Sequence, residues 1–196
     1  MQRKDALIVV DVQNDFCPGG ALAVQSGDEV VSVLNRYMEK FAAAGLPIVA
    51  TRDWHPQKTR HFKSYGGMWP AHCVQGTRGA AFHADLRLGN NVTVVSKGTA
   101  PDEDSYSAFQ GKDHSGTALA ELLRRWGVEK IFVGGLATDY CVKQTVLDGL
   151  HQGFTVVVLD DAIRGVNLNP NDSKEALIEM RQAGAATLAS IDELSI

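Results

Sequence analysis

The sequence predicts an α/β fold in which a mainly parallel, six-stranded sheet carries helices on both faces. Three observations support this. The chain has 196 residues, enough for one domain with a sizeable core. Short β-branched, apolar runs recur along it, and helical patterns separate most of them. Such alternation implies right-handed crossovers and an open, doubly wound sheet, so we expect a single domain over residues 1–196.

The expected strands are apolar on both faces, as strands of a buried parallel sheet are. Five of them are clear, and the sixth is weaker because it is short. They are expected at 6–12, 47–51, 92–96, 131–134, 154–159 and 186–189.

The expected helices carry apolar residues at spacings that gather on one face. Gly45 ends the first helix and Gly127 the second. Ser115 is expected to cap the second helix, and Thr138 the third. The apolar stripes of the first two cover 30–41 and 119–126, and the other two helices are expected over about 139–151 and 172–183.

One interval, about 52–91, interrupts this alternation. It has no clean helical pattern, and Pro, Gly, His and Trp are frequent in it. Loop-rich insertions of this length inside a compact domain are usually functional. We therefore expect it to carry metal-binding or substrate-binding residues.

Composition excludes several classes of function. Lys and Arg number 19 against 23 Asp and Glu, a net charge of -4, and there is no basic run to bind nucleic acid or an anionic membrane. No apolar stretch is long enough to span a bilayer, and the start of the chain lacks the pattern of a secretory signal. Three cysteines, an odd count, are typical of reduced thiols, so we expect a cytoplasmic protein.

Reactive side chains lie at the ends of four expected strands. They are Asp11, Asp53, Lys97 and, after the fourth strand, Cys141. Ligands of open α/β sheets bind outside the carboxyl ends of the strands. Four such residues at equivalent positions favour a functional site over packing.

Cys141 is the candidate nucleophile. With Thr138 as the N-cap, Cys141 lies in the first helical turn, where the helix dipole lowers the pKa of a thiol. The small residues before it would let a substrate carbonyl approach backbone N–H groups that act as an oxyanion hole. An inert buried cysteine is the alternative.

Asp11 and Lys97 could complete a triad with Cys141. The carboxylate would take the thiol proton, and the ammonium would stabilise the carboxylate and the developing thiolate. An Asp–Lys ion pair without chemistry accounts for the same residues, and spacing does not separate the two readings.

Asp53 and His55 are candidate metal ligands. Residues two apart in an extended segment point the same way, so this carboxylate and imidazole could share a metal ion. His61 and His72 could add nitrogen ligands, a set that suits Zn, Fe or Mn without selecting among them. Three aromatic residues in loops either pack locally or stack on a flat substrate: Phe16, Trp69 and Tyr106.

Taken together, these segments resemble the nicotinamidases (pyrazinamidases) of the isochorismatase-like cysteine hydrolase superfamily. The nucleophile turn Gly-Leu-Ala-Thr-Asp-Tyr-Cys-Val (135–142) and Val-Asp-Val-Gln-Asn-Asp-Phe (10–16) carry the resemblance most strongly. Matches in the same order follow at 51–56, 69–74, 97–98 and 104–109. The resemblance runs from residue 8 to about 165, and it implies a Rossmann-like, three-layer fold.

The resemblance also implies roles for single residues. Asp11, Lys97 and Cys141 correspond to the catalytic triad, and Ala137 and Cys141 to the backbone oxyanion donors, with a cis peptide at Leu136–Ala137. The metal ligands implied are Asp53, His55 and His72, joined in some relatives by a histidine at the position of His61. The walls around the substrate ring implied are Phe16, Trp69, Tyr106 and Ala137.

The activity implied is hydrolysis of nicotinamide to nicotinic acid through a cysteine thioester, as a step of NAD salvage, with pyrazinamide as a further substrate. The cofactor implied is one divalent metal ion, zinc first and iron or manganese as alternatives. Relatives are often dimers or larger, so a homo-oligomer is the partner to expect. The rival readings are a cysteine amidohydrolase acting on a carbamoyl or maleamate-type amide, and a non-catalytic, metal-binding thiol sensor.

Overall fold

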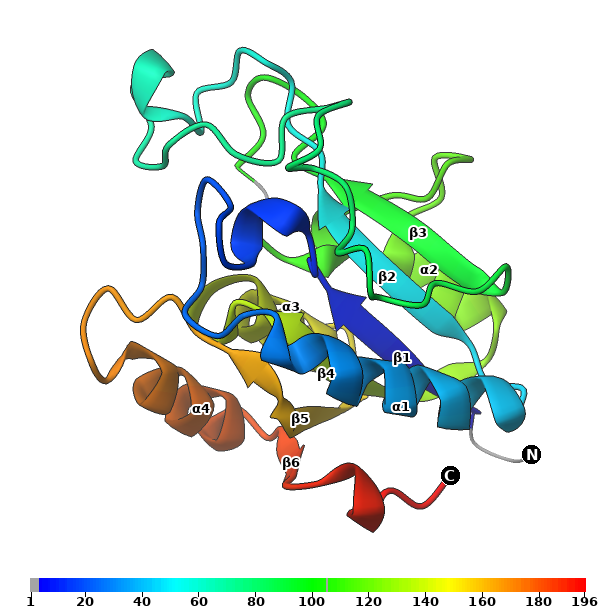
Figure 1. The fold of residues 1–196 in the computed structure, drawn as a ribbon. Coiled ribbons are helices and arrows are strands. Elements are labelled where there is room, and N and C mark those ends of the chain that lie inside the picture. The colour runs from blue at the N-terminus through cyan, green and yellow to red at the C-terminus, as the bar shows by residue number, and fades with distance from the viewer. Residues whose placement is uncertain (1–3, 105) are drawn as a thin grey trace.

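A six-stranded, all-parallel sheet with the order β3-β2-β1-β4-β5-β6 forms the centre of the protein (Figure 1). The computed structural model describes residues 4–104 and 106–196. The strands are β1 (Lys4–Val10), β2 (Ile48–Asp53), β3 (Val92–Lys97), β4 (Val128–Leu136), β5 (Thr155–Arg164) and β6 (Ala186–Leu188). The predicted fold class is therefore confirmed.

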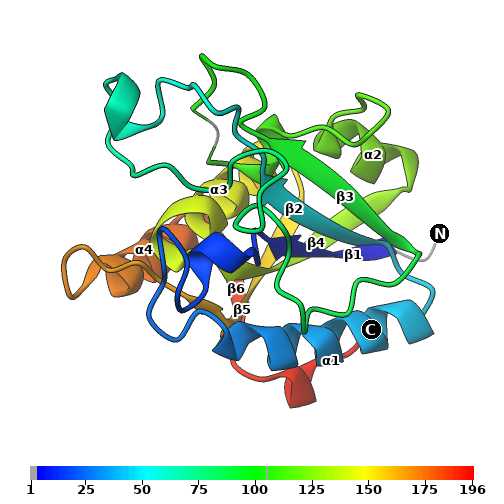
Figure 2. The same ribbon diagram turned by 45° about the horizontal axis from the view of Figure 1, so that its top comes forward.

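Helices cover both faces of the sheet (Figure 2). α1 (Glu29–Ala43) packs on one face, and α2 (Leu119–Arg125), α3 (Lys143–His151) and α4 (Asp172–Gln182) pack on the other. Side chains of β1 alternate between the two layers, because successive residues of a strand point to opposite faces. Leu7 and Val9 lie in the core beneath α1, whereas Ile8 and Val10 lie in the core on the opposite side.

Two strands are longer than the sequence predicts. β4 extends over 128–136 and β5 continues to Arg164. Asp160 and Asp161 interrupt the apolar run and hide this continuation, although Ala162 and Ile163 are buried again. The β4–β5 pairing changes register between Val133 and Gly135, which accommodates the extra residues.

Both predicted helix caps are wrong. α2 begins after Ala118, because Ser115 belongs to a turn in which the Asp113 carboxylate accepts hydrogen bonds from Ser115 and from the Thr117 N–H. A π-helical turn, Thr138–Val142, precedes α3, and its N-cap is Ala137. Such turns are rare and are frequent at functional sites.

The segment between β2 and β3, where the sequence predicts an insertion, consists mostly of loops. Between β2 and β3 the structure has a single short 3-10 turn, Lys63–Tyr65, and isolated bridges such as His55 with Val74. These loops gather over the carboxyl ends of β1 and β2 (Figure 1). Among residues 4–104 and 106–196, no helix is both long enough and apolar enough to cross a membrane.

Candidate active site

The strand order brings the four predicted reactive residues together. Asp11 follows β1, Asp53 ends β2, Lys97 ends β3 and Cys141 lies in the turn after β4. Because these four strands are neighbours and parallel, all four side chains lie at one edge of the sheet.

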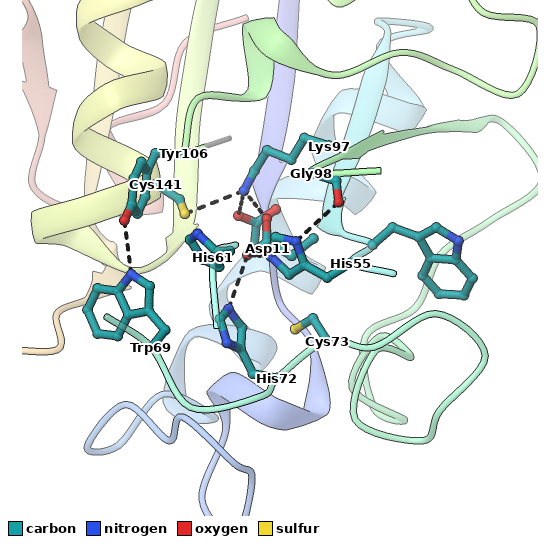
Figure 3. A network of polar contacts seen from close by, with 12 residues as sticks. Asp11, His55, His61, Trp69, His72, Cys73, Lys97, Gly98, Tyr106 and Cys141 are labelled. Carbon is teal, nitrogen blue, oxygen red and sulfur yellow. Dashed lines mark hydrogen bonds and ion pairs between the residues drawn. The ribbon is translucent and has the colours of Figure 1, made fainter. Parts of the chain in front are cut away.

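Lys97 links the predicted triad (Figure 3). Its Nζ lies 2.9 Å from Asp11 Oδ2 and 3.5 Å from Cys141 Sγ. One carboxylate oxygen of Asp11 lies within 4.8 Å of the sulfur of Cys141. Lys97 also pairs with the Asp53 carboxylate, so one ammonium bridges two acids and the thiol.

Burial and charge set the protonation of this group. Burial on its own lowers the pKa of Lys97, but Asp11 and Asp53 raise it well above its ordinary value, so the ammonium stays charged. Burial raises the pKa of Asp11, and Lys97 opposes this shift. The triad therefore holds a fixed cation beside a carboxyl group that can gain and lose a proton.

The expectation of a lowered thiol pKa is wrong. Burial raises the pKa of Cys141 well above its ordinary value; Lys97 opposes this, and Asp11 and Asp53 add to it. Because the sulfur lies beside two carboxylates, local helix geometry does not decide its charge. It rests as a thiol and needs a base to become a nucleophile.

The backbone before Cys141 approaches β1 closely. Gly135 has a φ of 125°, and a Cβ there would meet the Val10 backbone, with the amide nitrogen 2.7 Å away. Only glycine fits this position. The Leu136–Ala137 peptide is cis, as the resemblance implies.

The candidate metal ligands also lie together. Side-chain nitrogens of His55, His61 and His72 are all within 4.8 Å of one another. Asp53 Oδ2 lies 3.7 Å from His55 Nε2 and 3.9 Å from His72 Nε2. Lys97 and the imidazoles hold the pKa of Asp53 below its ordinary value, although burial opposes this.

Hydrogen bonds orient each imidazole toward the centre of this cluster. The Nδ1 atoms face oxygen acceptors: the Gly98 carbonyl for His55 (3.1 Å), the Pro70 carbonyl for His72 (2.8 Å) and the Asp104 carboxylate for His61. An oxygen that only accepts places the proton on Nδ1 and leaves the Nε2 lone pair for a metal ion.

The protonation of the cluster suits a cation. Burial lowers the pKa of His72 to about 4, so its imidazole is neutral at pH 7. Nε2 of His55 is buried and has no hydrogen-bond partner among the described residues. Buried polar nitrogens are normally partnered, so an orphaned lone pair fits a metal ligand. These residues form a group that could hold a divalent metal ion.

A small pocket lies beside the thiol and the histidines. All four predicted substrate-wall residues line it: Phe16, Trp69, Tyr106 and Ala137. Trp69 Nε1 donates a hydrogen bond to Tyr106 Oη at 2.9 Å, which fixes the two rings against each other. Because aromatic side chains form most of these walls, the pocket suits a flat ring.

A family model described as the isochorismatase domain matches residues 5–192. The chain belongs to the isochorismatase-domain family. The match covers nearly the whole chain, so the recognition made from the motifs is confirmed.

Relatives of this isochorismatase-domain protein are similar over nearly their whole length. It is 44% identical to the nicotinamidase of Escherichia coli (strain K12), over 96% of this chain and 97% of that protein. It is 42% identical to the nicotinamidase/pyrazinamidase of Mycobacterium tuberculosis (strain ATCC 25618 / H37Rv), over 94% of this chain and 98% of that protein. The crystal structure of the pyrazinamidase of Pyrococcus horikoshii in complex with zinc has a TM-score of 0.88 and 46% identity, over 94% of this chain and 98% of that one.

Sequence reasoning missed three residues that line the pocket of this isochorismatase-domain protein: Leu22, Tyr140 and Val166. The Tyr140 ring meets the Trp69 ring edge-on, with centroids 5.0 Å apart. Val166 follows the carboxyl end of β5, so the strand-end rule that found Asp11 would have found it too. Leu22 lies in an irregular loop and gives no such signal.

Proposed function

We propose that this protein hydrolyses nicotinamide to nicotinic acid and ammonia, as an amidohydrolase with a cysteine nucleophile. One observation carries the proposal: the thiol of Cys141, the carboxylate of Asp53 and the imidazoles of His61 and His72 all line one small pocket with aromatic walls. The near-full-length similarity to nicotinamidases supports the substrate.

In the first half-reaction, Asp11 acts as the base. It takes the thiol proton, and the sulfur of Cys141 attacks the carboxamide carbon. Because the thiol pKa is raised, this transfer accompanies attack, and Lys97 stabilises the thiolate as it forms. The backbone N–H groups of Ala137 and Cys141, both at the pocket, hold the oxyanion. Asp11 then protonates the departing nitrogen and the C–N bond breaks. Ammonia is released, and the acyl group remains bound to Cys141 as a thioester.

The second half-reaction runs the same groups in reverse. Asp11 is a carboxylate again and takes a proton from a water molecule, which attacks the thioester carbon. The C–S bond breaks, nicotinic acid leaves, and the sulfur recovers its proton from Asp11. Lys97 holds the Asp11 side chain in place through both halves, since its Nζ lies 2.9 Å from Oδ2.

Asp53, His55, His61 and His72 would hold one divalent metal ion, which we propose to be zinc, with iron or manganese as alternatives. A bound ion would supply a Lewis acid for the ring nitrogen of the substrate. The Phe16, Trp69 and Tyr106 side chains enclose the ring and exclude water, so the carboxamide is presented to the sulfur.

The rival amidohydrolases of the superfamily, which act on carbamoyl or maleamate-type amides, generally lack these metal ligands. The inward-facing histidine cluster therefore favours a pyridine or pyrazine carboxamide, so we propose pyrazinamide as a second substrate. A thiol sensor would leave the Asp11–Lys97–Cys141 arrangement without a use. We also propose a cytoplasmic location and a role in NAD salvage.

The test is ammonia release from nicotinamide, pyrazinamide and maleamate, with and without a chelator. We expect turnover of the two ring amides that falls on chelation and returns when zinc, iron or manganese is added. Turnover of maleamate alone would support the rival amidohydrolase. Metal binding without turnover of any amide would support the thiol sensor.

A further inference from the structure

The carboxylate of Asp139 is a buried acid that the mechanism above does not use. Asp139 lies in the π-helical turn, two residues before Cys141, and is 7% exposed. Its Oδ1 accepts the Val166 N–H at 2.9 Å, and its Oδ2 accepts the Asn167 N–H at 2.7 Å. Both donors belong to the loop between β5 and α4.

This loop is shaped to fit the carboxylate. Asn167 has a φ of 52°, a left-handed conformation that turns successive N–H groups toward one acceptor. The Asn167 side chain accepts the Ser173 N–H at 2.9 Å and so ties the loop to the start of α4. A Cβ at Gly165 would lie 3.1 Å from Asp139 Oδ1 and would collide with Ser173 Oγ, so glycine permits the close approach.

The hydrogen bonds connect two parts of the pocket. Val166 lines it from the loop, and Cys141 lines it from the turn. Hydrogen bonds to a carboxylate are about twice as strong as those between neutral groups. Asp139 therefore fixes the distance between the nucleophile's turn and an opposing apolar wall.

We propose that Asp139 is a positioning residue that holds Val166 against the pocket and so limits the site to unsubstituted six-membered heteroaromatic carboxamides. The substrates named here rest on the proposed function, whereas the hydrogen bonds of Asp139 are independent of it. Without the carboxylate, two N–H groups lose their acceptors, the loop opens, and rings with an added substituent fit.

The test uses the full chain loaded with zinc. D139N keeps the size of the side chain but turns an amide NH₂ toward a backbone N–H. We expect KM for nicotinamide to rise about tenfold, as for loss of one charge-assisted hydrogen bond. We expect kcat to stay within about threefold, because Lys97 still contacts both Asp11 and Cys141. The rate ratio of 5-methylnicotinamide to nicotinamide should rise as well.

The matched control is D172N. Asp172 is in the same region and its carboxylate accepts the Asn169 N–H at 2.8 Å, but it does not line the substrate pocket. D172N should keep the KM and the ring preference of the parent. V166A makes the side chain at this wall smaller and should raise the same rate ratio. This variant tests the proposal even if D139N does not fold.

Amide hydrogen exchange provides a readout apart from activity. Val166 and Asn167 should lose protection in D139N and keep it in D172N. Unchanged protection in folded D139N would overturn the proposal, and so would a parental ring preference in V166A. If the parent protein releases no ammonia from nicotinamide, the proposed function is refuted. Amide hydrogen exchange by itself would then test the role of Asp139.

Discussion

Replacing Thr51 by valine removes a hydroxyl beside the proposed base and changes little else. Thr51 lies in β2 and is fully buried. Its Oγ1 donates a hydrogen bond to Asp11 Oδ1 at 2.7 Å and accepts the Asp11 N–H at 3.3 Å. Because valine has the same shape as threonine, T51V isolates the contribution of these hydrogen bonds.

The size of the effect follows from the kind of bond. A hydrogen bond to a charged group contributes about 1.5–3 kcal/mol, so we expect a loss of about 2 kcal/mol of stability. In a chain of this length that lowers Tm by about 4–8 °C. Lys97 still pairs with the other Asp11 oxygen at 2.9 Å, so the carboxylate keeps its ion pair.

The same hydroxyl affects catalysis through the pKa of Asp11. Burial raises that pKa, and the hydrogen bond from Thr51 is among the interactions that lower it. Removing the bond therefore raises it further. Asp11 must be ionised to accept the thiol proton, so the acid limb of kcat/KM should move to higher pH.

The assay is the pH profile of kcat/KM on nicotinamide, together with thermal unfolding. T145V is the matched control: Thr145 is fully buried in α3 and its Oγ1 accepts the Ala108 N–H at 3.0 Å, a bond that involves no atom of the triad. T145V should lower Tm and leave the profile in place. If T51V lowers Tm but its acid limb stays with that of the parent, Asp11 is not the base that sets this limb.

Three further substitutions test the rest of the site. C141A should lower ammonia release by about 10⁴-fold or more while thermal unfolding stays close to that of the parent; residual turnover near the parental rate would exclude the thioester. H55A should weaken metal binding by about 100-fold, measured by metal analysis after dialysis, and stoichiometric metal would remove His55 from the ligand set. G135A should cost about 4 kcal/mol or more in chemical denaturation, since a Cβ would meet the Val10 backbone. A parental denaturation midpoint for G135A would contradict this close approach.

The sequence predicts the sheet well because its strands are apolar on both faces. The reactive residues could be predicted for the same reason, since the ends of parallel strands meet at one edge. The pKa of the thiol could not be predicted, because the two carboxylates that oppose ionisation of Cys141, Asp11 after β1 and Asp53 at the end of β2, are distant from it in the sequence. The prediction of an N-cap at Thr138 was wrong because the turn there is π-helical, and the spacing of apolar residues does not identify such a turn.

The residues that hold the site in place are the least predictable, as Gln13 illustrates. β1 ends at Val10, but β2 continues to Asp53. The Gln13 amide takes the place of a strand partner: its Oε1 accepts the Asp53 N–H and its Nε2 donates to the Asp53 carbonyl, both at 2.8 Å. Nε2 also donates to the Ala80 carbonyl at 2.9 Å, which ties the insertion to the sheet.

Asp53 is thus fixed by its backbone through Gln13 and by its carboxylate through Lys97. Its second carboxylate oxygen faces the histidines, so the same residue belongs to the charge network of the triad and to the metal cluster. A change of charge in the triad or in the metal cluster must therefore alter the electrostatic environment of the other. Metal binding and thiol reactivity are therefore coupled through Asp53, a link that only the assembled ends of β1, β2 and β3 create.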